Sequence, residues 1–268
     1  MRIRSSRLGF APSVSALQMI DMCSRDLVPE DSALMKWHQG YLANHRVRLA
    51  HDLDIINREI SKTDSILELG SVPLILTSAL RRSGYKVIGC DIAPERYSTS
   101  IRSVGLDVIK CNIETENLPF SDGTFDALIF NESFEHLRIN LIFTLSEILR
   151  VLKPKGMLTL STPNLKSLDG IRNFLLNDRA SSCSSSIFTE YKKLTDIGHM
   201  GHVREYTPTE VVGFLQNIGF EVAAIIYRGE YANRLKRTLS SLIPRLSPYV
   251  SYIATKPEGS RQIQAPEN

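Results

Sequence analysis

The spacing of apolar and polar positions changes along the chain and predicts two kinds of structure. Residues 31–60 carry apolar residues such as Trp37, Tyr41 and Leu53 at helical spacing. From residue 65 onwards, short apolar runs alternate with helical stretches, which is typical of a parallel sheet with crossover helices. The runs are nearly continuous, as strands covered on both faces require. The predicted strands are Ser65–Gly70, Lys86–Ile92, Asp107–Ile113, Phe125–Asn131, Met157–Ser161, Glu221–Tyr227 and Tyr249–Thr255.

Glycine, proline and capping residues bound the helices between these strands. Gly84, Gly105 and Gly219 each follow a helical stretch as a stop signal. The segment 207–210, Thr-Pro-Thr-Glu, reads as an N-cap with proline at the first helical position. We therefore predict a Rossmann-like, doubly wound, seven-stranded α/β sheet, mostly parallel with an antiparallel last strand, plus N-terminal helices. The crossover helices are predicted at 74–83, 95–103, 141–152 and 208–218.

Residues 165–200 interrupt this alternation. They contain the run RASSCSSS (Arg179–Ser186), which is too polar to build core. Because the insertion follows the fifth strand at the ligand edge of the sheet, we predict a mobile lid on the substrate side. We divide the chain into a helical segment 1–61 that covers the cofactor, a main domain 62–257 and a disordered tail 258–268. Residues 1–30 are predicted as loop or weak helix.

Composition narrows the class of protein. The 268 residues, 43% hydrophobic, suffice for one large α/β domain with attached elements. A net charge of +3 gives no argument for nucleic-acid binding, and no nucleic-acid partner is expected. Four scattered cysteines without a CxxC pair favour a reduced, cytoplasmic protein. The sequence contains no apolar run of the roughly 20 residues that a membrane span needs.

Two residues at strand ends suggest a nucleotide-like ligand. Gly70 ends the first strand, where a glycine lets the backbone turn sharply and approach a ligand closely. Asp91 ends the second strand, where a carboxylate can accept hydrogen bonds from both ribose hydroxyls. An ordinary turn glycine and a helix N-cap acid are the alternatives for these two residues.

The order of the segments is more specific than either residue alone. ILELG, GCDIAP, CNIETENLPFSDGTFDALIFNESFEHL and EILRVLKPKGMLTLSTPN follow one another, and GHVREYTPTEVVGFLQNIGFEV closes the domain. This order resembles class I S-adenosylmethionine (SAM)-dependent methyltransferases, type 11/12-like. It is most similar to the branch with quinone-biosynthesis and small-molecule O-methyltransferases. The resemblance covers residues 65–257 and implies SAM as the cofactor.

The resemblance also implies roles for nine residues at the strand ends. Glu68 and Gly70 would line the methionine end of SAM with Ser71 beside them, Asp91 would hold the ribose, Ile92, Asn112 and Ile113 would meet the adenine, and Asn131 and Glu132 would lie near the sulfonium and the acceptor.

The chain departs from the family pattern in two places. The glycine-rich turn of the family normally has two further glycines, and here those positions are Val72 and Leu74, with Pro73 between them. Asn112 replaces the usual acid after the third strand and can still donate or accept a hydrogen bond.

An oxygen acceptor would benefit from a base, and His136 and His202 are the catalytic candidates. His136 follows the fourth strand on the ligand side, and packing at a helix start is its alternative role. His199 and His202 are spaced to bind a metal, but no third ligand is evident in the sequence, and we predict no metal site. Arg46 could pair with the SAM carboxylate or remain solvated.

Two other functions compete with methyl transfer. An NAD-dependent oxidoreductase would need GxGxxG after the first strand, and ELGSVPL lacks it. A non-catalytic SAM-fold protein for regulation or assembly is the second, favoured by the two missing glycines. For an enzyme, the absence of an Asn-Pro-Pro-Tyr-type segment after Asn131 disfavours methylation of a base or amide nitrogen. A hydroxyl on a small-molecule, sugar or lipid-linked acceptor is the preferred substrate.

The segment Arg234–Leu246 concerns whether the acceptor is met in solution or at a membrane. Leu235, Leu239 and Leu242 fall on one stripe at helical spacing, and no acid interrupts the four cations of the segment. Pro244 is expected to end or kink the helix. The segment could dock on an anionic membrane as a peripheral helix, or its leucines could cover the body of the domain.

Overall fold

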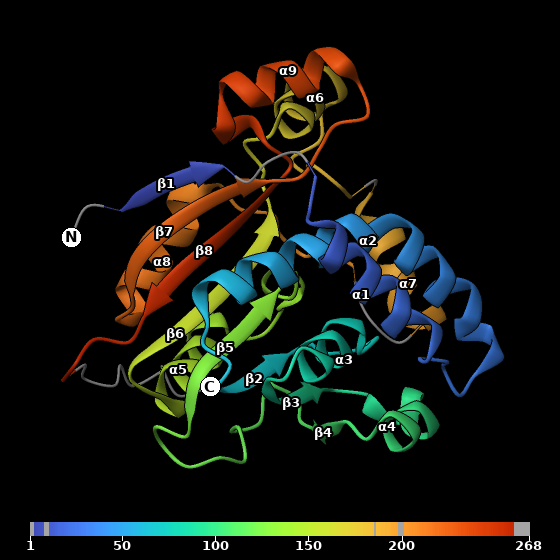
Figure 1. Ribbon diagram of the computed structural model, residues 1–268. Helices are drawn as coiled ribbons and strands as arrows, with labels where there is room; N and C mark the ends of the chain where they lie inside the picture. Colours follow the sequence, from blue (N-terminus) through green and yellow to red (C-terminus); the bar gives the residue numbers. More distant parts are fainter. Residues whose placement is uncertain (1–2, 8–10, 185, 198–200, 260–268) are drawn as a thin grey trace.

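A computed structural model describes residues 3–7, 11–184, 186–197 and 201–259. One mixed sheet runs through it with the strand order β1-β7-β8-β6-β5-β2-β3-β4 (Figure 1). β8 is antiparallel to both neighbours, β6 and β7, and the other pairs are parallel. The predicted doubly wound sheet with an antiparallel last strand is confirmed. The strands are β1 (Arg4–Arg7), β2 (Ser65–Leu69), β3 (Lys86–Asp91), β4 (Asp107–Lys110), β5 (Phe125–Asn131), β6 (Leu152–Pro163), β7 (Glu221–Arg228) and β8 (Tyr249–Thr255).

The described residues form eight strands, one more than the predicted seven. The additional strand, β1, pairs in parallel with β7 at the edge of the sheet, with Arg4 opposite Ala224. Its sequence, RSSR, contains no apolar residue, so no alternation could mark it as a strand. An edge strand needs backbone pairing on one side only, and it can form without a buried face.

Helices cover both faces of the sheet (Figure 1). Successive residues of β5 point to opposite faces: Leu128 and Phe130 join the core under α5 and α8, and Ile129 joins the core under α1, α2 and α3. The helices are α1 (Val14–Arg25), α2 (Ser32–Glu59), α3 (Ile75–Arg82), α4 (Ser98–Val104), α5 (Leu141–Val151), α6 (Leu168–Asn177), α7 (Ile187–Ile197), α8 (Pro208–Ile218) and α9 (Arg234–Leu242).

Local signals explain where several helices begin and end. Thr207 and Glu210 form a capping box at the start of α8, and Gly219 ends that helix in the left-handed conformation, as predicted. Ser13 caps α1, which lies in the region predicted as loop or weak helix. α9 ends at Leu242, just before Pro244, as the missing N–H of proline requires.

The insertion 165–200 carries two helices, α6 and α7. The serine run between them is held by hydrogen bonds rather than by apolar packing, because the Glu205 carboxylate accepts N–H groups from Ser182 and Cys183. α6 and α9 lie side by side at one end of the molecule, beyond the sheet (Figure 1), and Lys236 bonds to Asp169 between them. The predicted disordered tail 258–268 lies outside the described residues from residue 260 onwards.

Candidate active site

The carboxyl ends of β2, β3 and β5 meet at one edge, and Gly70 forms the first turn there. Gly70 has φ 68°, a left-handed conformation that glycine adopts without steric cost. A Cβ at this position would lie 2.3 Å from the Oγ of Ser133 in the loop after β5. The turn after β2 and the loop after β5 therefore approach one another closely, and any side chain at residue 70 would separate them.

The turn after Gly70 contains a second residue in the left-handed conformation, Leu74. Leu74 has φ 68° and is fully buried at the start of α3. A non-glycine residue in this region is strained, and it persists only where packing over-determines it. The buried leucine side chain supplies that packing. The replacement of glycine at residue 74 therefore does not open the turn.

Asp91 is fixed by the same turn. Its Oδ2 accepts the N–H of Val72 at 3.0 Å, and its Oδ1 accepts the N–H of Ala93 at 3.0 Å. Burial raises the pKa of this carboxyl, and these backbone hydrogen bonds oppose the rise. Each carboxylate oxygen keeps a second lone pair, so Asp91 can still accept two ribose hydroxyls.

Asp91→Ala is expected to weaken SAM binding by about 1–3 kcal/mol, because hydrogen bonds to a charged acceptor are individually strong. Titration calorimetry with SAM and with S-adenosylhomocysteine measures the loss. Asp107→Ala, at the exposed start of β4, serves as the matched control and should bind like the wild type. Wild-type affinity in the Asp91 variant would contradict the ribose assignment.

A cavity of about 260 Å³ lies over these strand ends. Most of the predicted cofactor-binding residues line it, and Ile92, 51% exposed, presents an apolar side chain to it. A smaller adjoining cavity of about 30 Å³ is lined by Glu68 and Ser71. Burial raises the pKa of Glu68 to about 8, although Thr77 donates a hydrogen bond to it at 2.6 Å. The larger cavity is lined by Gly70, Asp91, Ile92, Asn112, Ile113, Asn131 and Glu132 of the predicted set.

Val72, at a position where the family pattern has led us to expect glycine, lines both cavities. Val72→Gly is expected to retain SAM binding and to tighten it if the valine methyl groups crowd the ligand. Titration calorimetry with SAM tests this, with circular dichroism to establish that the variant folds. A folded Val72→Gly protein that does not bind SAM would show that the turn is aligned wrongly with the family.

Helix α2, which precedes β2, borders the cavity of about 260 Å³, but not through the predicted arginine. Trp37 and Tyr41 of α2 line the cavity. Arg46 is not among the residues that line it and pairs with Asp21 of α1. Arg48, on another side of the helix, lines the small cavity, and its Nε is buried without a hydrogen-bond partner among the described residues. Arg46 is therefore not placed to meet a ligand in this cavity, although the sequence had suggested that it could, and Arg48 is the arginine that lines the small cavity.

Glu132 lies in a buried ionic network at the end of β5. Its Oε1 accepts from Arg228 at 3.1 Å, and its Oε2 lies 3.3 Å from Arg48. Arg228, a fully buried residue of β7, also pairs with Asp52 of α2 at 3.0 Å. This network joins α2, β5 and β7. It fixes the Glu132 side chain at the border of the cofactor cavity.

A second cavity, of about 580 Å³, adjoins the first. Its floor comes from the loop after β5 and the end of β6, and its sides come from α2, α7 and the chain before α8. The two cavities share four lining residues: Trp37, Tyr41, Glu132 and His136. A ligand in one cavity can therefore reach a ligand in the other at the position of these side chains.

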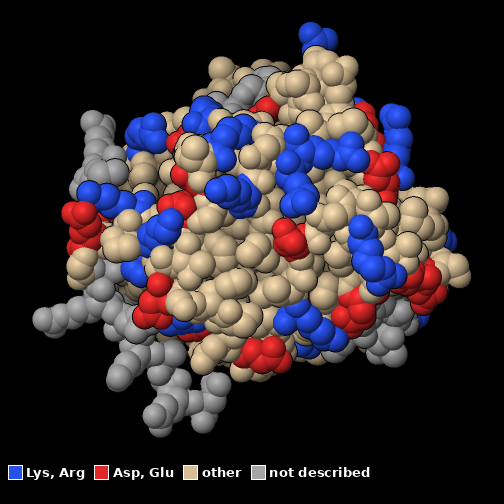
Figure 2. All heavy atoms as spheres, turned by 60° about the horizontal axis from the view of Figure 1, so that its bottom comes forward, with Lys and Arg blue, Asp and Glu red and all other residues tan. Residues whose placement is uncertain are grey.

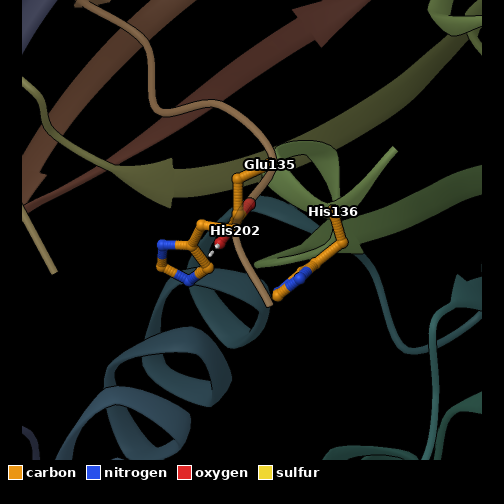
Figure 3. Close-up of side chains that lie close together, drawn as sticks. All are labelled: Glu135, His136 and His202. Atoms are coloured by element: carbon orange, nitrogen blue, oxygen red, sulfur yellow. Dashed lines mark ion pairs between the residues drawn. The ribbon is translucent and has the colours of Figure 1, made fainter. Parts of the chain in front are cut away.

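Both predicted catalytic histidines line the second cavity, where their rings stack edge to face with centroids 5.0 Å apart. Glu135 lies beside them (Figure 3), 1% exposed, with Oε1 3.8 Å from His202 Nε2. His202 Nδ1 is 2.9 Å from Glu205 Oε1. His199, the other predicted candidate of this segment, lies outside the described residues.

The two carboxyl groups around His202 differ in their surroundings. Burial raises the pKa of Glu135, and the charge of His202 opposes this. Burial would also raise the pKa of Glu205, but hydrogen bonds from His202 and Ser182 lower it to about 2. Glu205 therefore stays ionised and holds His202 through Nδ1, so that Nε2 faces Glu135 and the cavity. By contrast, burial and Arg48 lower the pKa of His45, in the same cavity, to about 3.

The sequence did not mark Glu135, Glu205, Arg48 or Arg228 as site residues. Glu135 stands next to His136 in the segment FEH, and this adjacency was the only signal available for it. The other three come from helix α2, strand β7 and the chain before α8, which meet the site only through the fold.

The face that carries β4 and α4 bears charged side chains of both signs (Figure 2). Figure 2 shows acidic and basic side chains interspersed over this face. A stripe of one sign, which is the usual footprint of a nucleic-acid partner, is not visible there.

A protein-family model matches the central part of the chain. Residues 67–160 match a family model described as a methyltransferase domain. The match contains β2 to β5 and most of β6, which carry the predicted cofactor residues. A comparison with curated protein sequences gives no match.

Solved structures share the fold at low sequence identity. A SAM-dependent methyltransferase of Archaeoglobus fulgidus has a TM-score of 0.57 and 17% identity, covering 82% of this chain and 100% of that one. A possible histamine N-methyltransferase of Thermotoga maritima has a TM-score of 0.55 and 18% identity, covering 83% and 96%. A Haloferax volcanii methyltransferase, in complex with the Trm112 activator, has a TM-score of 0.54 and 16% identity, covering 90% and 98%. These matches confirm the fold.

Proposed function

We propose that this chain, a class I SAM-dependent methyltransferase, transfers the methyl group of SAM to a hydroxyl of a small-molecule or lipid-linked acceptor. The supporting observation is the junction of two cavities, one over the cofactor strands and one of about 580 Å³ beside it. Glu132 and His136 lie at that junction. The volume of the second cavity suits a small molecule or a headgroup.

We assign each part of SAM to residues that line the cavity of about 260 Å³ or the small adjoining cavity of about 30 Å³. The methionine carboxylate is assigned to Arg48, whose buried Nε has no hydrogen-bond partner among the described residues, and the ammonium to Glu68. The positive ammonium would favour the ionised form of Glu68, whose pKa is raised to about 8 without it. The ribose would bind Asp91, and the adenine would pack on Ile92 and Ile113.

Methyl transfer is an in-line displacement in which the protein mainly positions the reactants. The acceptor oxygen forms a bond to the methyl carbon, and the carbon–sulfur bond breaks with its electron pair going to sulfur. The acceptor also loses its hydroxyl proton, so the products are the methyl ether, S-adenosylhomocysteine and a proton. We assign activation of the acceptor hydroxyl to His136 and His202, which line the acceptor side of the junction.

An acceptor search tests the proposal. The protein is incubated with SAM carrying a labelled methyl group and with cell extracts separated into soluble and lipid fractions. We expect label transfer to a compound whose new methyl group is an ether, identified by mass spectrometry and NMR. An N-methyl product would overturn the hydroxyl assignment. SAM binding without transfer to any fraction would instead favour a regulatory or assembly role.

A lipid-linked acceptor is favoured by the surface that α6 and α9 form together, which we call the α6–α9 surface. Leu235, Leu239 and Leu242 are exposed, so they do not cover the body of the domain. α6 adds Phe174 and Leu175 to the same end of the molecule (Figure 1). The same two helices and the chain just after α9 also carry five basic residues, of which Arg172 and Lys236 pair with Asp169 of α6. The five are Arg172, Arg234, Lys236, Arg237 and Arg245.

Apolar residues flanked by cations complement an anionic bilayer surface, and we propose this as the occupant of the α6–α9 surface. The surface lies beyond the carboxyl end of β6, and Pro163 at that end also lines the acceptor cavity. Docking would bring the cavity close to a lipid-linked substrate. In the described part of the chain, no helix combines the length and apolar character needed to cross a membrane.

We expect co-sedimentation with anionic vesicles at low salt, fading as salt rises, with each cation contributing roughly 1 kcal/mol. A variant with Arg234, Lys236, Arg237 and Arg245 changed to glutamine should lose it. The control changes four exposed cations elsewhere, Arg58, Lys86, Lys110 and Lys155, and alters net charge equally. Equal loss in both variants, or no preference for anionic vesicles, would end the membrane proposal.

A further inference from the structure

Three side chains of types that can bind a metal ion lie close together in the cavity of about 580 Å³. One oxygen of Glu135 and one nitrogen each of His136 and His202 lie within 4.8 Å of one another. Figure 3 shows the three side chains grouped together, two from the loop after β5 and one from the chain before α8. We propose that Glu135, His136 and His202 bind a divalent transition-metal ion. The sequence predicted no metal site, because no third ligand was evident beside His199 and His202.

The spacing of the three donor atoms suits a single ion. Donor atoms lie about 2.0–2.2 Å from Zn²⁺, so those sharing one ion are separated by roughly 3–3.5 Å. Glu135 Oε1 and His202 Nε2 are already 3.8 Å apart, too far for a hydrogen bond. Side-chain shifts on the order of 1 Å therefore close the three atoms around an ion.

The Glu135 carboxylate is buried with one oxygen that lacks a hydrogen-bond donor among the described residues. Glu135 is 1% exposed, and its Oε2 accepts the hydroxyl of Thr162 at 3.1 Å. Its Oε1 has no hydrogen-bond partner among the described residues. A buried carboxylate oxygen without a donor is energetically costly, and a bound cation removes that cost. The unpartnered oxygen is the one that faces His202.

Glu205 gives His202 the orientation of a metal ligand. Histidines that bind metals commonly donate their other ring N–H to a carboxylate, which fixes the tautomer and the ring. Here Nδ1 of His202 is 2.9 Å from Glu205 Oε1, and Nε2 remains directed towards Glu135. Glu205 is in turn held by the N–H groups of Ser182 and Cys183. The serine run of the insertion thus supports the site from outside.

The donor set selects the class of ion. Two imidazoles and one carboxylate favour Zn²⁺, Mn²⁺ or Fe²⁺ over Mg²⁺ and Ca²⁺, which prefer oxygen ligands throughout. Three protein ligands also leave at least one coordination position open, as in catalytic zinc sites. All three residues line the cavity of about 580 Å³, so the open position faces the acceptor.

This location gives the ion a role in the proposed function, on which this part of the inference rests. The acceptor hydroxyl would occupy the open position, and coordination would lower its pKa. Its proton would leave to water, and the oxygen would attack the methyl carbon of SAM. The carbon–sulfur bond then breaks with its electron pair going to sulfur, and the methyl ether leaves the ion. His136 and His202 then activate the acceptor as ligands of the ion.

Metal binding is measured without any acceptor, so its outcome is independent of the proposed function. Chelator-treated full-length protein is titrated with Zn²⁺, Mn²⁺ and Mg²⁺ by calorimetry, and Co²⁺ is added to record its visible absorption. We expect one ion per chain and tighter binding of Zn²⁺ than of Mg²⁺. Glu135→Gln, His136→Ala and His202→Ala should each weaken binding at least about tenfold, and Glu205→Gln about 10–100-fold.

His45→Gln is the matched control, because His45 lies in the same cavity outside the cluster and should leave Zn²⁺ affinity unchanged. Circular dichroism and SAM titration establish that each variant folds. No stoichiometric binding by the folded wild type would overturn the site, as would equal affinity in the cluster variants and the wild type.

Once an acceptor has been identified, chelation should abolish methyl transfer, and added Zn²⁺ or Mn²⁺ should restore it. Undiminished transfer after complete removal of metal would overturn the catalytic role.

Discussion

His136→Ala is expected to lower kcat by about 10²–10⁴-fold, which is the usual contribution of a group that activates an acceptor by removing or acidifying its proton. SAM affinity should change less than tenfold, or about 1.4 kcal/mol. His136 lines both cavities, but the proposed ribose and methionine contacts are assigned to Asp91 and to residues around the turn after β2. His202→Ala should show a similar loss, because both histidines converge on one point beside Glu135.

Steady-state kinetics with the identified acceptor, together with SAM titrations, separate the two effects. His38→Ala is a suitable control, because His38 is a buried histidine bonded to Tyr97 and belongs to neither cavity. A His136 variant with wild-type kcat, or one whose entire loss is in SAM affinity, would contradict a role in acceptor activation.

The cofactor half of the site could be predicted because strand ends are local features. Gly70 and Asp91 each follow an apolar run that specifies a strand, and parallel strands place their carboxyl ends at one edge. Their sequence positions therefore determine their positions in space. Both residues line the cofactor cavity.

The acceptor half could be predicted only in part, because its partners come together across long separations. His202 was identified, but the Glu135 that faces it is 67 residues earlier in the chain, and no periodicity links the two. Glu205 could not be predicted for a related reason, because its carboxylate accepts hydrogen bonds from backbone N–H groups of the serine run, about 20 residues earlier in the chain. That run was judged only by its lack of apolar residues.

Arg46 and Arg48 show how a helix can be predicted correctly and a contact wrongly. Residues two apart on a helix point to different sides, since successive residues turn by about 100°. The sequence predicted the helix over residues 31–60 but did not specify which of its sides meets the cofactor. The packing of α2 against α1 decides this, pairing Arg46 with Asp21 and turning Arg48 towards the site.

The network around Arg228 is the feature on which we expect the stability of the site to depend most. Arg228 is fully buried, and its guanidinium compensates the carboxylates of Asp52 and Glu132 at 3.0 and 3.1 Å. Burial lowers the pKa of Arg228, and the charge of Asp52 opposes this. Breaking a buried pair by removing one partner is costly, because the other charge is left in a medium that solvates it poorly.

Arg228→Met is therefore expected to lower the free energy of unfolding by about 3–5 kcal/mol, as in other buried pairs that lose one partner. Urea unfolding followed by circular dichroism measures the change. Arg58→Met, at an exposed pair with Glu59, is the control and should cost no more than about 1 kcal/mol. Adding Asp52→Leu to Arg228→Met should recover part of the loss, since it removes one of the uncompensated carboxylates. An Arg228 variant as stable as the Arg58 variant would show that the buried charges are solvated by other means and that Glu132 is positioned without Arg228.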